Sequence, residues 1–313
     1  MYLPYLRGKQ FELLALRELT ALPLDPNKIS PIIEPLKKEL KSIETAIRAL
    51  SAQKIQVQLV VNPEHGDLKK NYKPILDFIS RLLDEGIDNI IPTYLIANEQ
   101  DFQFFKSSSL QENYLSNGYS LIHLNQISSG AELKQIANNS NLQYNLIHVS
   151  HLIAMRRGFS TGLLGFVNDS FIKQKRNVDY ENSVDEIFSS DYFYYRSEGF
   201  DAFADYVTVG AEYVEGGMLP FAVVIHLTYK DYNSDDIRIQ HFLSDNNLDA
   251  SDTAGKFGEA LGKLIAFVDA EGINSLAVRQ FRDYYARGAF PGLGVIKKLS
   301  IMHHIELVQS LLP

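Results

Sequence analysis

The sequence contains no cysteine and no tryptophan, and both absences limit what the protein can be. Without cysteine there can be no disulfide, no thiol nucleophile and no thiolate metal site, which suits a reducing cytoplasm. Aromatic bulk comes instead from 17 Tyr and 18 Phe, within a hydrophobic content of 45%. We therefore expect a cytoplasmic protein with a substantial packed core.

A basic excess and long hydrophobic runs are missing as well. The chain has 38 acidic and 30 basic residues and a net charge of −8, whereas broad nucleic-acid binding needs a surplus of Lys and Arg. Charged side chains interrupt the first twenty residues, so we expect no secretory signal peptide. No later window reaches the length of a membrane span, and no membrane association is expected.

Three motifs that mark common reaction classes do not occur: the P-loop, the Gly-x-Gly-x-x-Gly fingerprint and the Gly-x-Ser-x-Gly elbow. Nucleotide hydrolysis, dinucleotide redox chemistry and ordinary serine hydrolysis therefore lose support, and nothing indicates a cofactor. Residues 62–67 bring Glu64, His65 and Asp67 together, but Pro and Gly in the same segment favour a surface turn. His303 and His304 lack the i, i+4 spacing of zinc hydrolases, and we expect them to be exposed. No metal site is predicted.

Apolar strand-like runs alternate with helical patterns along the first two thirds of the chain. This rhythm predicts an α/β fold, a (β/α)8 TIM-barrel-like architecture, with an open doubly wound sheet as the alternative if the first and eighth strands do not pair. No linker rich in Pro, Gly or Ser separates two halves, so residues 1–313 are expected to form a single barrel-like domain. The predicted strands are residues 1–6, 29–36, 55–61, 89–96, 120–124, 144–149, 161–167 and 200–210.

A strand and hairpin region at residues 205–245 follows a long polar insertion, and C-terminal helices occupy residues 252–313. Residues 221–229 are β-branched and aromatic, residues 237–242 alternate, and the polar residues between them predict a late antiparallel β-hairpin. A loop with an even number of residues would place His226 opposite His241, about 5 Å apart at Cβ. A loop with an odd number would break this pairing.

The two hairpin histidines are candidate catalytic residues. They would share a face with apolar side chains, where neutral imidazole is favoured over the charged form. His226-x-Thr228 and His241-x-x-Ser244 resemble the paired His-x-Thr/Ser motifs of two-histidine phosphoesterases, although the second has the wrong spacing. The competing interpretation is a pair of structural histidines that bond to the backbone or to Tyr229.

Polar residues at strand ends form a second candidate set, because the carboxyl ends of barrel strands share one rim. Glu34 ends an apolar strand, and a carboxylate there requires a cation or a hydrogen-bond donor, for which Arg7 and Lys9 are the obvious partners. A structural ion pair and a ligand site fit this arrangement equally well. Arg176 belongs to one of two basic clusters that suit phosphate-bearing ligands. Other strand-end residues on the predicted rim are Asn62, Tyr94, His123, Asn168 and Asp205.

Several segments resemble the Beta-protein family of phages and bacteria, and the likeness covers most of residues 1–270. They include residues 5–16, Pro31-Ile-Ile-Glu-Pro35, Asp205-Tyr206, Arg176-Asn-Val-Asp-Tyr180, Glu215-Gly-Gly217, His226-Leu-Thr-Tyr229 and His241-Phe-Leu-Ser-Asp245. Members of this family often lie in prophages or in mobile and defence gene neighbourhoods beside a second protein. The resemblance therefore implies a context, anti-phage defence or phage–host conflict, rather than a reaction.

Two functions follow as hypotheses. The first is a binding or sensor subunit that pairs with a second, nearby-encoded effector protein, for example a nuclease-like one. The second is a phosphoesterase-like barrel hydrolase for a phosphate-bearing ligand or a nucleic-acid end. In the hydrolase, Arg7 and Lys9 clamp the anion, Glu34 orients or acts as base, and His226 and His241 are acid and base. Ligand contacts would come from Arg7, Lys9, Asn62, Asn168, Arg176 and Asp205.

Overall fold

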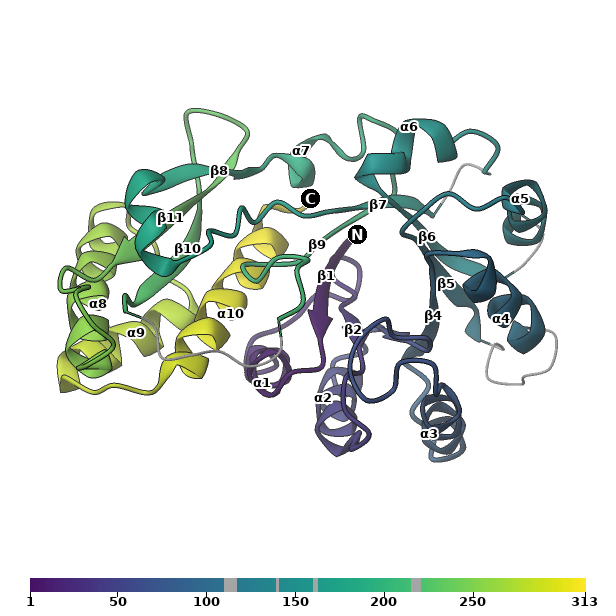
Figure 1. Ribbon diagram of the computed structural model, residues 1–313, viewed down its shortest axis with the longest axis horizontal. Coiled ribbons are helices and arrows are strands. Elements are labelled where there is room, and N and C mark those ends of the chain that lie inside the picture. The colour runs from purple at the N-terminus through teal and green to yellow at the C-terminus, as the bar shows by residue number, and fades with distance from the viewer. Residues whose placement is uncertain (110–116, 139–140, 160–162, 215–220) are drawn as a thin grey trace. The chain divides into compact units, whose positions relative to one another are not determined.

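The computed structural model describes residues 1–109, 117–138, 141–159, 163–214 and 221–313 (Figure 1). Within them the chain divides into two compact units. Unit 1 comprises Met1–Leu13, Pro23–Asn168 and Asp191–Asp205, and unit 2 comprises Leu14–Leu22, Asp169–Ser190 and Tyr206–Pro313. The hairpin region and the C-terminal helices, expected within one barrel domain, therefore belong to a unit of their own, because the hairpin pairs with a strand outside the barrel.

Unit 1 is a closed barrel of eight parallel strands, which confirms the (β/α)8-like fold. Its first strand pairs with the second and also with the last, so the sheet closes and the open doubly wound alternative is excluded. The strands are buried over nearly their whole length, as expected when helices cover the outside of a parallel sheet. They are β1 (Tyr2–Arg7), β2 (Ile32–Glu34), β3 (Val57–Val60), β4 (Ile90–Ile96), β5 (Tyr119–His123), β6 (Leu142–His148), β7 (Leu164–Asn168) and β9 (Ala202–Asp205).

Helices follow most barrel strands, and their apolar stripes explain why they form. In α2, Ile43, Ala46, Ile47 and Leu50 are buried at the i, i+3, i+4, i+7 spacing of one helix face. Burial of each large aliphatic side chain contributes about 1.5–3 kcal/mol. The helices that lie wholly in unit 1 are α2 (Lys41–Ser51), α3 (Lys73–Asp84), α4 (Glu99–Ser109), α5 (Gly130–Asn138), η2 (Val149–His151), α6 (Leu152–Met155) and α7 (Asp191–Tyr194). The first helix, α1 (Gln10–Leu19), begins in unit 1 and belongs to unit 2 from Leu14 onward.

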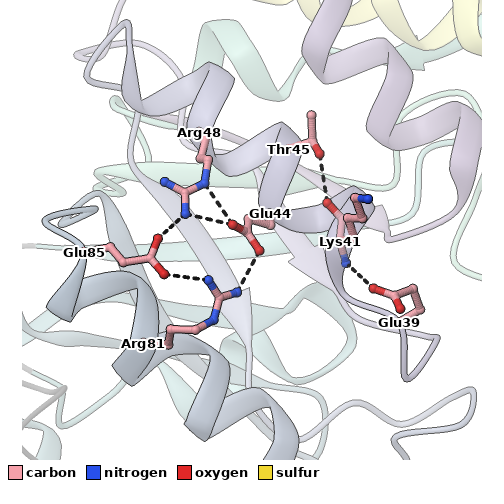
Figure 2. Close-up of polar contacts among 7 residues, drawn as sticks. All are labelled: Glu39, Lys41, Glu44, Thr45, Arg48, Arg81 and Glu85. Carbon is pink, nitrogen blue, oxygen red and sulfur yellow. Dashed lines mark hydrogen bonds and ion pairs between the residues drawn. The ribbon is translucent and has the colours of Figure 1, made fainter.

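A charged network joins α2 and α3 on the helix layer (Figure 2). Arg48 bonds Glu44 on its own helix at 2.8 Å and reaches Glu85, while Arg81 bonds Glu85 at 2.8 Å and Glu44 at 2.7 Å. The two arginines lower the pKa of the Glu44 carboxyl, with the Arg81 hydrogen bond as the largest cause. All four groups satisfy one another near solvent, so the network links helices rather than forming a ligand site.

The barrel interior contains a polar layer centred on the buried Gln58. Its amide nitrogen donates to Ser30 Oγ at 2.9 Å, and its amide oxygen accepts from Ser120 Oγ at 2.7 Å and from Thr93 Oγ1 at 3.3 Å. β3 and β5 are separated by β4 in the sheet, so the bond from Ser120 to Gln58 passes over one strand. This layer marks which face of each strand points inward.

Unit 2 contains a three-stranded antiparallel sheet in the order β10-β11-β8 and three long helices. β10 (Val224–Lys230) and β11 (Ile237–Leu243) form the expected hairpin. β8 (Asp185–Ser189) comes from the insertion between the last two barrel strands and pairs with β11. A short helix, η3 (Asn177–Asn182), precedes β8. The closing helices are α8 (Thr253–Ala270), α9 (Leu276–Arg287) and α10 (Leu293–Leu311).

The hairpin loop has an even number of residues, because Lys230 pairs with Ile237. His226 therefore pairs with His241, as the even-loop alternative predicts. The Glu215-Gly-Gly217 segment of the family resemblance lies outside the described residues. No described helix has the length and apolar composition needed to cross a membrane.

Candidate functional site

The carboxyl end of the barrel places Tyr5, Arg7 and Glu34 on the inward face. Arg7 pairs with Glu34 in the β1–β2 register, and Tyr5 is two residues earlier on the same face. The Tyr5 hydroxyl donates to Glu34 Oε2 at 3.1 Å, and Arg7 Nε lies 3.7 Å from the same oxygen. Glu34 is only 2% exposed. The expected Arg7–Glu34 ion pair is therefore present, buried at the rim.

The loop after β3 provides the other partners of Glu34. The Glu64 backbone N–H donates to Glu34 Oε1 at 3.0 Å, and His65 Nδ1 lies 3.3 Å from the same atom. Gly66 fixes this loop, since its φ is +77° and an added Cβ would lie 2.2 Å from the Leu36 carbonyl oxygen. Both oxygens of the Glu34 carboxylate thus have partners from the chain.

His65 is the functional candidate that this geometry adds. Its side chain is 35% exposed, whereas the Glu34 side chain behind it is 2% exposed. A buried carboxylate that bonds one ring nitrogen can orient a histidine for proton transfer through the other. Burial and the Glu34 charge raise the pKa of the neighbouring Glu64 carboxyl. The residue is part of a turn in the sequence, and no local pattern there marks its contact with Glu34.

The other predicted rim residues are engaged elsewhere. The Asp205 carboxylate accepts the Tyr2 hydroxyl at 2.8 Å. Because Asp205 pairs with Pro4, three residues before Arg7, it lies on the opposite face of the sheet from Arg7 and Glu34. Asn62 bonds the backbone N–H and carbonyl of Leu95 at 2.9 and 2.8 Å, and so extends the β3–β4 pairing.

The remaining members of the predicted ligand set also have chain partners. Asn168 donates to Asp191 at 3.0 Å. Arg176, in unit 2, donates to the Asp179 carboxylate from its backbone N–H at 3.0 Å and from its guanidinium at 2.6 Å, with its side chain 71% exposed. Lys9 contributes its backbone carbonyl to the start of α1, where the N–H groups of Glu12 and Leu13 donate to it.

Tyr94 and His123 face the helix layer rather than the barrel mouth, which corrects their expected position on the rim. The Tyr94 hydroxyl accepts from Ser108 in α4 at 3.1 Å. His123 is fully buried, bonds Asn145 at 2.6 Å through Nε2 and packs against Phe159. Strand alternation explains both positions, because a strand end alone does not determine which face a side chain takes.

In unit 2 the hairpin histidines form a half-buried chain of contacts with a carboxylate. His226 Nδ1 lies 2.6 Å from His241 Nδ1, and His241 Nε2 lies 3.1 Å from Glu186 Oε1 on β8. Rings of Phe171 and Tyr180 pack against both imidazoles. Burial lowers the pKa of His226 well below its ordinary value and also lowers that of His241, so both rings are neutral at pH 7.

His303 and His304 are buried, contrary to the expected exposure. His303 Nδ1 lies 2.8 Å from Ser275 Oγ, and its Nε2 lies 2.7 Å from the Thr228 carbonyl. His304 Nδ1 lies 3.0 Å from the Thr228 hydroxyl. Because α10 packs against β10, its two adjacent histidines both contact Thr228. Among the described residues no cluster of His, Asp and Glu has the arrangement needed to hold a metal ion.

No family model matches the chain, and neither the curated proteins nor the solved structures include one that matches it.

Proposed function

We propose that this chain is a binding or sensor subunit of a bacterial anti-phage defence or phage–host conflict system, and that it pairs with a second effector protein. The context comes from the resemblance to the Beta-protein family. The preference for binding over catalysis comes from the rim of the barrel, where enzymes of this architecture place their reactive groups.

One observation carries this preference: polar side chains expected to form a reactive pocket are bonded to other parts of the chain. The Glu34 carboxylate accepts hydrogen bonds from the Tyr5 hydroxyl and from a backbone N–H of the loop after β3. The Asp205 carboxylate accepts the Tyr2 hydroxyl, and the Asn62 side chain accepts a backbone N–H of β4. Such bonds stabilise the fold by about 0.5–1.5 kcal/mol each, and a ligand would have to replace them. A structural role therefore accounts for them.

The surface that best suits a protein partner is the edge of the unit 2 sheet. β8 pairs with β11 on one side and has no second strand neighbour among the described residues. Val184 and Ile187 are 46% and 55% exposed there, and Val184 also lines a groove of about 780 Å³. An exposed strand edge with apolar side chains can accept an extended segment of another protein by strand addition.

The test is co-purification of the chain with the product of its neighbouring gene, together with a phage-protection assay. Ile187→Lys should reduce both, because it places a charge on the docking edge. Tyr232→Lys is the matched control, since Tyr232 is 88% exposed in the hairpin loop and is not part of β8. Unchanged co-purification of the Ile187→Lys protein, with its circular dichroism spectrum intact, would rule out the β8 edge as the docking surface.

A phosphoesterase-like hydrolase is the second candidate, and the Glu34–His65 pair favours it specifically. In this mechanism Glu34 orients the half-buried His65 imidazole, and the imidazole acts as general base. Arg7 and Lys9 bind the anionic group of a phosphate-bearing ligand or nucleic-acid end. Glu34→Gln and His65→Gln separate the candidates. The binding subunit predicts that His65→Gln keeps protection, whereas the hydrolase predicts protection lost in both variants with partner binding retained.

A further inference from the structure

A cavity of about 260 Å³ in unit 2 is lined by the hairpin, by the link between α8 and α9, and by helix α10. Its apolar lining includes Tyr229, Ile273 and Leu307, and its acidic lining consists of Glu271 and Glu306. The volume corresponds to roughly eight water molecules, so the cavity suits a small molecule. The chemistry of such a molecule depends on what the polar side chains leave unpaired.

Glu306, on α10, presents one paired and one unpaired carboxylate oxygen. Its Oε2 accepts the backbone N–H of Leu276, the first residue of α9, at 2.9 Å. Its Oε1 has no hydrogen-bond partner among the described residues, yet it keeps accessible surface. Burial raises the pKa of the Glu306 carboxyl more than the Leu276 N–H and the charge of Arg279 lower it. The chain therefore leaves part of this negative charge uncompensated.

The surroundings of Glu306 favour a positively charged occupant. Helix α8 ends at Ala270, and the residues that follow it, Glu271 to Ile273, line the cavity. The C-terminal end of a helix carries partial negative charge, to which the exposed Glu271 carboxylate adds. Lys230 is the one Lys or Arg among the described lining residues, but its ammonium donates to two carbonyls of the hairpin loop. The lining thus has an acidic excess.

An aromatic wall adds to the preference for a cation. The Tyr229 hydroxyl donates to Asp185 at 3.1 Å, and the Tyr229 ring packs edge-on with Phe267, which holds the ring in place. The face of an aromatic ring attracts ammonium and guanidinium groups, because its π-electrons carry negative charge. His303 also lines the cavity, but both of its ring nitrogens are already bonded within the chain. The accessible acceptor is therefore Glu306 Oε1, which needs a donor.

We propose that this cavity binds a small organic cation with N–H donors, a primary ammonium or a guanidinium, whose charged end bonds Glu306 Oε1 beside the Tyr229 ring. Such a bond between two charged groups is stronger than one between neutral groups. A quaternary ammonium has the same charge but no proton to donate, so it should bind more weakly. No β8 residue lines the cavity, and the site is independent of the proposed function.

The experiment titrates chain labelled with ¹³C at its Ile and Leu methyl groups, of which those of Ile273 and Leu307 report on the cavity. Four probes share one butyl group. n-Butylamine and n-butylguanidine carry a charge and N–H donors, butyltrimethylammonium carries the charge alone, and n-butanol is neutral. We expect at least one of the first two to shift both sets of methyl resonances, and the other two to bind at least about tenfold more weakly than it. The first two probes distinguish an ammonium from a guanidinium ligand.

Two matched variants test whether Glu306 holds the cation. Glu306→Gln keeps an oxygen for the Leu276 N–H but loses the charge, so the affinity for the bound cation should fall at least about tenfold. Glu259, on α8, is a carboxylate outside the cavity lining whose Oε2 accepts the backbone N–H groups of Asp245 and Asn246 at 2.7 and 3.1 Å. Glu259→Gln should leave the affinity unchanged.

Four results would each overturn the proposal: no methyl shift at Ile273 and Leu307 with either donor cation, equal affinity for n-butanol or butyltrimethylammonium, wild-type affinity in Glu306→Gln, or an equal loss in Glu259→Gln. If Glu306→Gln does not fold, the comparison of the four probes on the unaltered chain still decides. Partner co-purification is measured separately, so its failure and the failure of this site are distinguishable.

Discussion

Acid should destabilise this protein through its buried histidines, and His123 and His303 allow the effect to be calculated. Burial lowers the pKa of each ring to about 4, against an ordinary value of about 6.5. Between these values the unfolded chain binds more protons than the folded one, so the free energy of unfolding falls as the pH drops below about 6.5. Above that pH the contribution is fully present.

The magnitude follows from the two pKa values. At pH 5 each histidine removes roughly 2 kcal/mol from the free energy of unfolding relative to neutral pH. His226 and His241 act in the same direction, because burial lowers their pKa values as well. A loss of this size is a large fraction of the 5–15 kcal/mol that typically stabilises a folded protein.

Urea denaturation at a series of pH values between about 7 and 5 measures this loss. His123→Gln and His303→Gln each remove one titrating ring, so each should flatten the pH dependence even if the variant is less stable at neutral pH. His123 belongs to unit 1 and His303 to unit 2. If the two units unfold in separate transitions, each variant should change only its own. A wild-type stability that is flat down to pH 5, or variants with the wild-type slope, would refute the reasoning.

Two substitutions test how the barrel end is held. Gly66→Ala should destabilise unit 1 by about 1–3 kcal/mol, because it combines a positive φ with a steric clash against Leu36; a melting temperature equal to wild type would show that the loop can shift. Asn62→Leu should cost about 2–4 kcal/mol in urea denaturation, because it leaves the buried N–H and carbonyl of Leu95 without partners, and a loss below about 0.5 kcal/mol would mean that water replaces them.

The barrel could be predicted from sequence because each strand is a short apolar run between helical patterns. The third sheet strand of unit 2 could not, because β8 is mostly polar and partly exposed. Its sequence, Asp-Glu-Ile-Phe-Ser, carries no alternation that distinguishes a strand from a polar insertion. Only the pairing with β11 identifies it.

The residues of the candidate site also differ in how far their positions could be predicted from sequence. Arg7 and Glu34 end neighbouring strands, and their contact follows from strand order alone. Asp205 ends a strand too, but its face depends on a register that no sequence pattern sets. His65 contacts Glu34 from the loop after β3, and no local sequence pattern marks this contact.

The order of the segments along the chain has a consequence for how this protein is made. β8 and its flanking residues of unit 2 precede β9, the strand that closes the barrel, while the other two strands of the unit 2 sheet come after it. A ribosome therefore releases the first piece of the second sheet before the barrel is complete. No single cleavage of the chain separates one intact unit from the other. A chain truncated after β9 would contain β8 without the two strands that complete its sheet.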